Sequence, residues 1–589
     1  MDLRSVFEQW VSLSLPSFQH SIQLGGYHPC WTLFWAFFLL CLAVRVTTEL
    51  KFRKHQVNAA GSGLHVIPVV PYWIPWIGHS LSFAIGAVPY LQSVSRRMGH
   101  KCAAYGLWMG NTKHNIILAP SIAKQVITDR KAPVNMDTWT YYVHKQVFQD
   151  GGDLKTMHPH AVKGPIAQAV HNMVRDSFVN KAILAMVSDV EHMAADLISG
   201  KSVSEQSSWE LSGRVRVLET QPRLKWEVSL NPLMRDFTSD IMARVFLGKS
   251  FMRNNPNVVK DIWTLDDKII TFMAKTPTWM PNVREAAAAR ERLLAGLTEF
   301  HDAYTVYLRG EDPGASWGDM SDVSTVMHDR TLAWNASDAN TTRRGNAAQM
   351  LSLFWVTNVN ANQIIFWVVF YVFSDPVLLR QLREEIAPFV KRRRPTSGAQ
   401  DHNGTLKMDV EGLWRHCPLL KGAVFETLRL EVGATSVKYV EEDFVLHESE
   451  EDAKFLGKDR PESFLIKKGE MIWVPHALHQ LDEKYWPDPE RFDARRFWEE
   501  QSTHNDEKSS SEEVKVGYKT MKVWGGGEKM CKGKTFAERE ICLVASAIIT
   551  CWEIEAVDGV WRHPGRTPGS SSSKPIRDFR VRIWKWDQE

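Results

Sequence analysis

The chain has 589 residues, 44% of them hydrophobic, with 71 Lys and Arg residues against 68 Asp and Glu residues. This composition excludes a chain that is disordered or collagen-like as a whole, and the near balance of charge gives no reason to expect a nucleic-acid partner. The 7 cysteines are odd in number and widely spaced, and the sequence has no Cys-x-x-Cys pair. A disulfide framework or a zinc ribbon is therefore not expected.

An uncharged, apolar run lies near the N-terminus. It covers Tyr27–Val44, about 18 residues, which is near the lower limit for spanning a bilayer. Arg45, Lys51, Arg53 and Lys54 follow it, and the positive-inside rule then places the bulk of the chain in the cytoplasm. A buried core helix and a cleaved signal peptide are the alternatives. The basic flank argues against the first, and the long polar stretch before the run argues against the second.

The segment after the apolar run is rich in proline. Pro68, Pro71 and Pro75 restrict φ and disfavour a helix, which predicts a stiff, extended connector. We therefore predict a single-pass protein of the endoplasmic reticulum membrane, in contact with lipid, whose catalytic domain faces the cytoplasm. The predicted parts are a lumenal tail over residues 1–26, a transmembrane anchor over 27–46, a basic and Pro-rich hinge over 47–75, and a catalytic domain over 76–589.

The remainder of the chain has mainly helical patterns. Amphipathic or apolar helical periodicity occurs at Pro89–Met98, Asn231–Leu247, Val283–Leu308, Ala347–Phe373, Pro376–Val390, Lys421–Leu430 and Lys534–Cys551. Short strand patterns occur at Asn115–Leu118, Lys438–Leu446 and Ile472–Pro475. These strands are too few and too scattered for a doubly wound sheet, so the predicted fold is mainly α with small β-sheets. Polar stretches at residues 391–405, 501–514 and 564–574 are interpreted as surface insertions.

The residues with the clearest chemical signal lie near the C-terminus, in VWGGGEKMCKGKTFAERE. Cys531 stands just before a helical pattern that starts at Lys534, so loop N–H groups and the helix N-terminus would stabilise a thiolate there. Gly533 allows a flat ligand or a neighbouring backbone to approach closely. This arrangement suits a thiolate-bound metal whose other ligands come from a cofactor.

This segment has two other interpretations. Gly533-Lys534-Thr535 resembles the end of a P-loop, but the position that needs the first glycine of that motif holds Glu528, and no apolar strand leads into it. A lone structural cysteine in a glycine-rich loop is the other alternative, since free cysteines are usually buried and inert.

The wider pattern around Cys531 resembles the heme-binding loop of the cytochrome P450 family, Phe-x-x-Gly-x-Arg-x-Cys-x-Gly. Trp524 stands at the phenylalanine position, Gly527 and Gly533 at the glycine positions, and Lys529 at the arginine position. The resemblance implies that Cys531 is the axial ligand of heme b iron and that Trp524 packs beneath the heme. Lys529 would meet a heme propionate, although lysine lacks the bidentate fork of arginine.

Two further motifs resemble the family in order and spacing. Glu426-x-x-Arg429 resembles the Glu-x-x-Arg pair of the family's K helix, and it lies roughly 100 residues before Cys531, as the family requires. Arg496 lies in a segment that resembles the family's aromatic–arginine region, and the resemblance implies a buried network of these three residues that supports the fold. Lys438 stands where many members place an arginine against the second propionate. The segment from Pro68 to the C-terminus most resembles the cholesterol 7α-hydroxylase and prostacyclin synthase branch and related fungal natural-product enzymes.

The resemblance also assigns the distal side of the heme. Most members carry an acid followed by threonine on the long I helix, where the pair manages protons while dioxygen is cleaved. Matching the helix by its closing Phe366-Trp367 places Asn360 at the acid position and Ala361 at the threonine position. Ala361 removes the hydroxyl, and Thr357, Asn358 or the substrate could replace it. The alternative is that these asparagines only satisfy a bulge in the helix.

The predicted function follows from the resemblance. It is oxidation of a lipophilic small molecule, a terpenoid, steroid or polyketide of secondary metabolism, with dioxygen and with electrons from NADPH through NADPH-cytochrome P450 reductase. A reductase-independent isomerase or dehydratase is the alternative that Ala361 favours, and a non-catalytic heme-binding membrane protein is the third. Family geometry predicts a substrate pocket lined by Asn135–Phe148, Trp355, Thr357 and Val432–Ser436, and a reductase surface near Lys529, Lys532 and Lys534.

Overall fold

The computed structural model of the chain describes residues 29–59, 64–99, 101–151, 168, 172, 176–219, 224–336, 342–392, 405–499, 514–527, 530–567 and 571–586. The chain divides into two compact units. The first contains the residues up to Gln125, Ala132–Val134 and Val440–Trp473, and the second contains Val126–Lys131, Asn135–Tyr439 and the residues from Val474 onward. Predicted site residue Lys529 lies outside the described residues.

The first unit combines one long helix with small sheets and short helices. Its elements are α2 (Pro29–Ala59), β1 (Leu64–Val66), α3 (Ser80–Ile85), α4 (Ala87–Met98), β2 (Ala104–Met109), β3 (Thr112–Ile117), β10 (Phe444–His447), α21 (Glu450–Phe455) and β11 (Ser463–Ile466). Strand β11 pairs in parallel with β1 and antiparallel with β10, and β3 pairs antiparallel with β2. Helix α5 (Pro120–Thr128) leaves this unit after Gln125, and β12 (Met471–Pro475) enters the second unit after pairing in parallel with β3.

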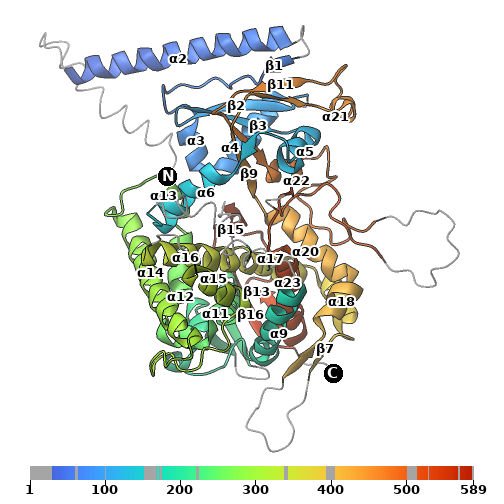
Figure 1. Cartoon of the computed structure of the whole chain (residues 1–589). Coiled ribbons are helices and arrows are strands. Elements are labelled where there is room, and N and C mark those ends of the chain that lie inside the picture. The colour runs from blue at the N-terminus through green and yellow to red at the C-terminus, as the bar shows by residue number, and fades with distance from the viewer. Residues whose placement is uncertain are drawn as a thin grey trace, which may run out of the picture. The chain divides into compact units, whose positions relative to one another are not determined.

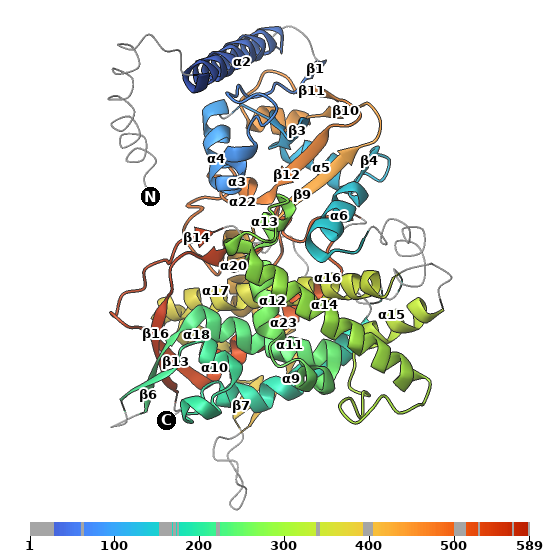
Figure 2. The ribbon, with the colours of Figure 1, turned by 90° about the vertical axis from the view of Figure 1, so that its left-hand side faces the viewer.

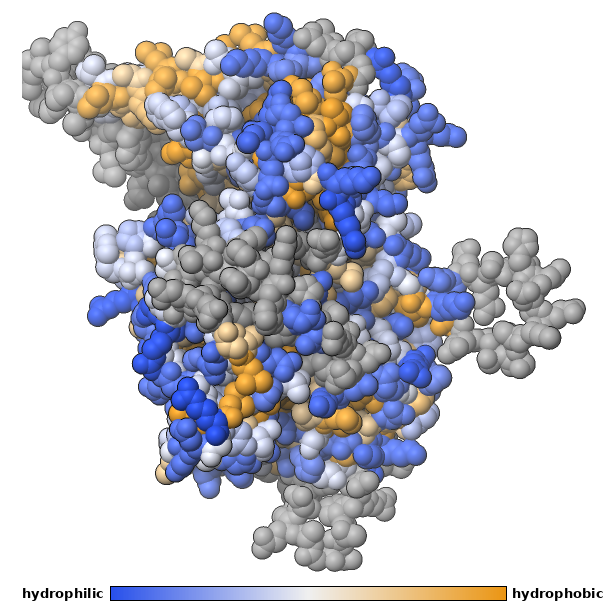
Figure 3. All heavy atoms as spheres, viewed as in Figure 1, coloured by the Kyte–Doolittle hydropathy of each residue, from blue (hydrophilic) through white to orange (hydrophobic). Residues whose placement is uncertain are grey.

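Helix α2 extends further than the predicted anchor. It continues to Ala59, through the first part of the segment predicted as a hinge. Residues 46–59 contain neither Gly nor Pro, and Glu49 forms i,i+4 ion pairs with Arg45 (3.2 Å) and Arg53 (3.0 Å) that support the helix. Trp31–His55 is long and apolar enough to cross a membrane, and only 6% of its most apolar window is buried. Figure 3 shows hydrophobic side chains along this exposed helix, at the top left of the view.

The second unit is mainly helical. Its N-terminal half contains β4 (Val134–Asn135, whose first residue belongs to the first unit), α6 (Asp137–Val143), the π-helical turn η1 (His144–Phe148), α9 (Asp176–Met193), η3 (Ala194–Asp196), η4 (Val203–Glu205), α10 (Ser208–Ser212), β5 (Arg216–Glu219), β6 (Lys225–Ser229), α11 (Leu230–Asn254), α12 (Val258–Asp266), α13 (Ile269–Met273), α14 (Pro281–Leu308) and α15 (Thr325–Asn335). Its C-terminal half contains α16 (Arg343–Val359), α17 (Ala361–Ser374), α18 (Pro376–Ile386), β7 (Val390–Arg392), β8 (Leu406–Met408), α19 (Val410–His416), α20 (Pro418–Glu431), β9 (Thr435–Val440, which ends at the first residue of the other unit), α22 (His476–Gln480), α23 (Lys534–Cys551), β13 (Trp552–Ala556), β14 (Arg566–Thr567), β15 (Lys574–Pro575) and β16 (Arg580–Lys585).

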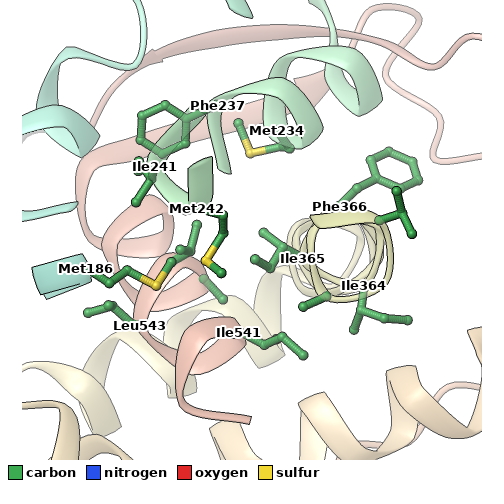
Figure 4. Close-up of a cluster of buried hydrophobic side chains, with 14 of the residues drawn as sticks. Met186, Met234, Phe237, Ile241, Met242, Ile364, Ile365, Phe366, Ile541 and Leu543 are labelled. Atoms are coloured by element: carbon green, nitrogen blue, oxygen red, sulfur yellow. The ribbon is translucent and has the colours of Figure 1, made fainter. Parts of the chain in front are cut away.

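Helix α17 forms the centre of the second unit and packs against α11, α20 and α23 (Figures 1 and 2). In the close-up, Ile365 of α17 and Met242 of α11 point toward one another, and Leu543 of α23 lies beside Met186 of α9 (Figure 4). The stretch Arg343–Ser374 is also long and apolar enough to cross a membrane, but 78% of its most apolar window is buried, as expected of core helices. Strands β13, β16, β6 and β5 form a four-stranded sheet, and β13 contacts α17 and α23.

Most of the predicted helices are present with small changes at their ends, and the helix predicted over Lys534–Cys551 has these bounds in the structure. The helix predicted over Ala347–Phe373 is instead two helices that meet at Asn360, whose φ of −91° and ψ of −62° stay in the right-handed helical region but distort the regular turn. The interpretation of residues 564–574 as a surface insertion is wrong for its last residues. Ser572 is 4% exposed and its backbone bridges to Val432, since this segment fills the space beside the end of α20.

Candidate active site

The loop before α23 presents the thiol of Cys531 at its end. The Cys531 N–H donates to the carbonyl of Trp524 (2.9 Å), which closes the loop, and α23 starts three residues later at Lys534. Surrounding protein atoms raise the pKa of the Cys531 thiol by desolvation, while the N–H groups of Gly533 and Lys534 act in the opposite direction. These N–H groups belong to the start of a helix, where unpaired donors and the helix dipole favour an anion. The N–H groups therefore offset part of the desolvation that disfavours a thiolate at Cys531.

Cys531 differs from the other cysteines of this unit in its accessibility. Its side chain is exposed, whereas Cys417, Cys542 and Cys551 are buried. Burial raises the pKa of the Cys417 thiol to about 12 and that of Cys551 to about 11, so both stay protonated at neutral pH. Cys531 can meet a ligand from outside the chain, and the buried cysteines cannot.

Two glycines of the loop are required by close packing. Gly527 has φ +60°, and a Cβ at this position would lie 2.6 Å from the carbonyl oxygen of Ile127. A Cβ at Gly526 would lie 2.6 Å from Cγ2 of Ile127. Both contacts are too short for any side chain, so the glycines let the loop lie directly on the residues at the end of α5. At Gly533 the nearest atom to such a Cβ is the Cys531 sulfur at 3.9 Å, so the space beside the sulfur is otherwise open.

The indole of Trp524 is held by a hydrogen-bonded chain. Its Nε1–H donates to the Tyr518 hydroxyl at 2.7 Å, and that hydroxyl donates to the carboxylate of Glu538 on α23. The Tyr518 ring stacks on Phe425 of α20 at 4.1 Å between centroids, and Lys534 lies 4.3 Å above the same ring. A phenylalanine at position 524 would lack the N–H that joins this chain. Lys534 lies against the loop and its side chain stays 30% exposed, so its place in the predicted reductase surface remains a prediction.

The structure brings together the three predicted support residues. Arg429 and Glu426 form a bidentate pair, with both N–O distances 2.8 Å and both side chains fully buried. Arg496 donates to the same carboxylate from Nε at 2.9 Å. Arg429 also donates to the carbonyls of Gln480 (2.7 Å) and Pro489 (2.8 Å). The network ties α20 to the segments at residues 480–496, which lead toward the Cys531 loop.

One of the two predicted propionate partners, Lys438, lies among the described residues. Lys438 lies on β9 and is 7% exposed. Lys529 falls outside the described residues. Both assignments remain predictions.

The predicted distal residue Asn360 lies at the break between α16 and α17, with φ −91° and ψ −62°. Its Nδ2 donates to the carbonyl of Val356 at 3.3 Å, one turn earlier, and its Oδ1 accepts a hydrogen bond from the Ser571 hydroxyl. The Ser572 hydroxyl donates to the Asn360 carbonyl at 3.3 Å. Asn360 thus forms hydrogen bonds both with its own helix and with the C-terminal segment.

Thr357 and Asn358, the residues that could replace the missing threonine hydroxyl, form hydrogen bonds with carbonyls of their own helix. The Thr357 hydroxyl bonds to the carbonyls of Leu353 (3.1 Å) and Phe354 (3.0 Å) of its own helix. Nδ2 of Asn358 donates to the Phe354 carbonyl at 2.8 Å, and its Oδ1 is buried without a hydrogen-bond partner. Ala361 is 8% exposed.

Several residues of the predicted pocket lining lie against one another. Phe148 of η1 and Trp355 of α16 have ring centroids 5.7 Å apart, and Trp355 Nε1 donates to Asp266 at 2.9 Å. Trp139 and Tyr142 of α6 are stacked at 5.8 Å. These contacts are aromatic, while α6 and η1 also carry Asp137, His144 and Lys145.

A comparison with models of protein families identifies the family of this chain. The Cytochrome P450 family model matches residues 68–575. The chain belongs to the cytochrome P450 family. Named relatives of this P450 include "Cytochrome P450 monooxygenase efuG" of Hormonema carpetanum, which is 23% identical over 91% of this chain and 93% of its own length. The "5-beta-cholestane-3-alpha,7-alpha-diol 12-alpha-hydroxylase" of Sus scrofa is 20% identical over 86% of this chain and 91% of its own.

A solved structure shows the same fold. "Retinoic acid bound cyanobacterial CYP120A1" matches 89% of this P450 and all of its own chain, with a TM-score of 0.59 and 16% identity. The predicted fold class, a mainly α P450 fold with small sheets, is confirmed, as is the prediction that the chain is a P450 monooxygenase.

The residues of this P450 fit the heme that the family uses. Cys531 offers one exposed sulfur with two N–H groups beside it, and the side of Gly533 next to the sulfur is open. Within the described ranges no group of three or more His, Cys, Asp or Glu side chains is arranged to hold a metal ion. A metal at Cys531 would therefore take its other ligands from a cofactor, as heme iron does.

Sequence reasoning missed the serines of the C-terminal segment as site residues. Ser571 and Ser572 lie beside Asn360, more than two hundred positions away in the chain. Their polar, low-complexity surroundings suggested only a surface insertion. A family-specific alignment of the last strands would have been needed to place them next to the helix break.

Proposed function

We propose that this P450 is a membrane-anchored heme-thiolate monooxygenase that oxidises a lipophilic small molecule. The observation that supports it most directly is the exposed thiol of Cys531, held at the start of α23 among N–H donors. Heme bound there supplies a thiolate-ligated iron able to activate dioxygen. In the reaction, a substrate C–H, dioxygen, NADPH and one proton give a C–OH, water and NADP⁺.

The residues of the chain have separate tasks in this proposal. Cys531 would donate its sulfur to the iron, and Trp524, held by Tyr518, would support the cofactor from the same side. The buried Glu426–Arg429–Arg496 network would keep the loop in register with α20. Asn360 would order the helix break where protons are delivered. Lys438 and Lys529 would pair with the propionates.

The substrate class is a terpenoid, steroid or polyketide of secondary metabolism. The aromatic contact of Phe148 with Trp355 supports an apolar ligand. Relatives named for hydroxylation of cholestane derivatives support the same class. We place the protein in the endoplasmic reticulum membrane, with the exposed apolar half of α2 as its anchor and Arg45, Lys51, Arg53 and Lys54 on the cytoplasmic side. NADPH-cytochrome P450 reductase would supply the electrons at the Cys531 side.

A second function is supported by one specific residue. Ala361 lacks the hydroxyl that most members use during dioxygen cleavage, and an isomerase or dehydratase acting on an already oxidised substrate has no need of it. Such an enzyme would require neither NADPH nor a reductase.

Product mass separates the two functions. The gene would be deleted in its host, and the accumulated intermediate would be supplied to membranes containing this P450 and reductase under ¹⁸O₂. Incorporation of one labelled oxygen that depends on NADPH supports the monooxygenase. A product of unchanged mass, or lighter by water, formed without NADPH refutes it in favour of the isomerase or dehydratase. Membranes carrying Cys531→Ser are the matched control and should form neither product.

A further inference from the structure

Arg330 on α15 is a buried positive charge without a negative partner among the described residues. It is 6% exposed, and its Nε is buried without a hydrogen-bond partner. Burial lowers the pKa of Arg330 to about 10, with no carboxylate to oppose the shift, and the guanidinium still carries its charge at neutral pH. An isolated charge inside a protein is strongly destabilising, so buried charges are normally paired.

The other buried arginines of the described chain have such partners. Arg429 pairs with Glu426 and also donates to two carbonyls. Arg290 donates to the carbonyl of Val147 at 3.1 Å and lies 3.9 Å from the carboxylate of Glu291. Arg330 therefore differs from both, and a group from outside the chain is needed to balance its charge.

The polar groups around Arg330 also lack an acceptor. Cζ of Arg330 lies 4.6 Å from the centroid of the Trp334 ring, and the His301 ring meets the same indole edge-to-face at 5.8 Å. The Trp334 Nε1–H, Nδ1 of His301 and the hydroxyl of Thr331 are buried with no hydrogen-bond partner in the described chain. Arginine and tryptophan side chains can only donate, and a threonine hydroxyl or an imidazole can donate as well. A negatively charged acceptor would satisfy these groups together.

Contacts between α14 and α15 hold these groups in place. The two helices lie against one another, as Figure 2 shows. The Tyr304 hydroxyl lies 3.1 Å from Nδ1 of His328, and Nδ2 of Asn335 donates to the Thr305 hydroxyl at 3.2 Å. Along α15 these contacts come before and after Trp334, which fixes the donors before any ion binds. Binding to fixed donors avoids the entropic cost of ordering them.

The charge balance favours a monovalent anion. One guanidinium offsets one negative charge, and burial, followed by the charge of Arg343, lowers the pKa of His301, so the imidazole adds no charge at neutral pH. A divalent anion would leave one of its charges unpaired in the interior.

We propose that Arg330, Trp334 and His301 form a buried binding site for a monovalent inorganic anion of the size of chloride. The bound ion pairs with the guanidinium, accepts the hydrogen bond of the indole N–H and links α15 to α14. None of these residues belongs to the candidate active site, and the site can be tested without turnover.

The test measures the unfolding midpoint of the full-length holoprotein in chloride against gluconate at constant ionic strength. For an ion that binds only the folded protein, and well below 1 mM, raising chloride from about 1 to about 100 mM increases the ratio of folded to unfolded protein by up to about 100-fold. The midpoint should rise accordingly in the unmodified protein and should not change with chloride in Arg330→Met. Arg290→Met is the matched control, because Arg290 is equally buried but already has partners in the chain, so this variant should keep the chloride dependence.

A second measurement follows the ion itself. The ³⁵Cl resonance should be broadened by the unmodified protein and by Arg290→Met, and not by Arg330→Met. Trp334→Phe keeps the ring and loses only the N–H, so chloride affinity should fall roughly tenfold; this variant carries the test if Arg330→Met does not fold. An ordered water in place of the anion would give no chloride dependence in the unmodified protein. That result, or equal chloride dependence in Arg330→Met, would overturn the proposal.

Discussion

Replacement of Glu426 by alanine should destabilise this P450 severely. Both Glu426 and Arg429 are fully buried, and Glu426 accepts two hydrogen bonds from Arg429 at 2.8 Å and one from Arg496 at 2.9 Å. The alanine variant leaves the Arg429 guanidinium buried without a carboxylate, hydrogen-bonded to the carbonyls of Gln480 and Pro489 and lying over the Trp486 ring. Loss of one member of a buried ion pair costs about 3–5 kcal/mol, a large part of the roughly 5–15 kcal/mol that stabilises a typical folded protein.

The assay is the thermal unfolding midpoint, together with the yield of heme-loaded protein. Glu285→Ala is the matched control, because Glu285 pairs with Arg292 at 2.9 Å on the surface, with side-chain exposures of 69% and 48%. An exposed pair of this kind contributes about 0–1 kcal/mol. The reasoning is refuted if Glu426→Ala unfolds within about 1 kcal/mol of Glu285→Ala and retains its heme.

Three further substitutions test other parts of the structure. Cys531→Ser should abolish the thiolate-type absorption of the reduced, carbon monoxide-bound protein, and a retained thiolate spectrum would contradict the assignment of the ligand. Gly422→Ala should lower the unfolding midpoint, because its Cβ would lie 1.9 Å from the Ala494 carbonyl oxygen. The overpacking costs about 1–3 kcal/mol, which exceeds the gain of roughly 1 kcal/mol in helix propensity. A raised midpoint would show that the helix is not packed this closely. Burial lowers the pKa of His476 from 6.5 to about 4, so the unfolded state binds its proton first and stability is lost as the pH falls from 6.5 toward 4. By pH 5 the loss is about 2 kcal/mol, seen as a steeper fall in unfolding free energy than in His476→Gln; equal pH dependence in both proteins would show that His476 is not the cause.

Helices α16 and α17 show what hydrophobic periodicity cannot predict. Apolar residues recur with helical spacing on both sides of a short polar run in Ala347–Phe373, which predicts one helix. The break at Asn360 depends on hydrogen bonds to Val356 and to Ser571, and the second partner comes from a segment far away in the sequence. Periodicity reports which face of a helix is buried and carries no information about a distant acceptor or donor.

The sequence by itself predicted the fold class, which the comparisons confirm, the order of the main helices and Cys531 as the candidate metal ligand, because these predictions depend on local signals. Gly-rich loop residues, a cysteine before a helical pattern and the Glu426-x-x-Arg429 spacing are all readable within a few turns of chain. Only the tertiary structure decided that Trp524 is tied to Tyr518 and that Ser571 bonds to Asn360. Such contacts form when packing of the core brings remote segments within hydrogen-bond distance, and no periodicity or spacing encodes that distance.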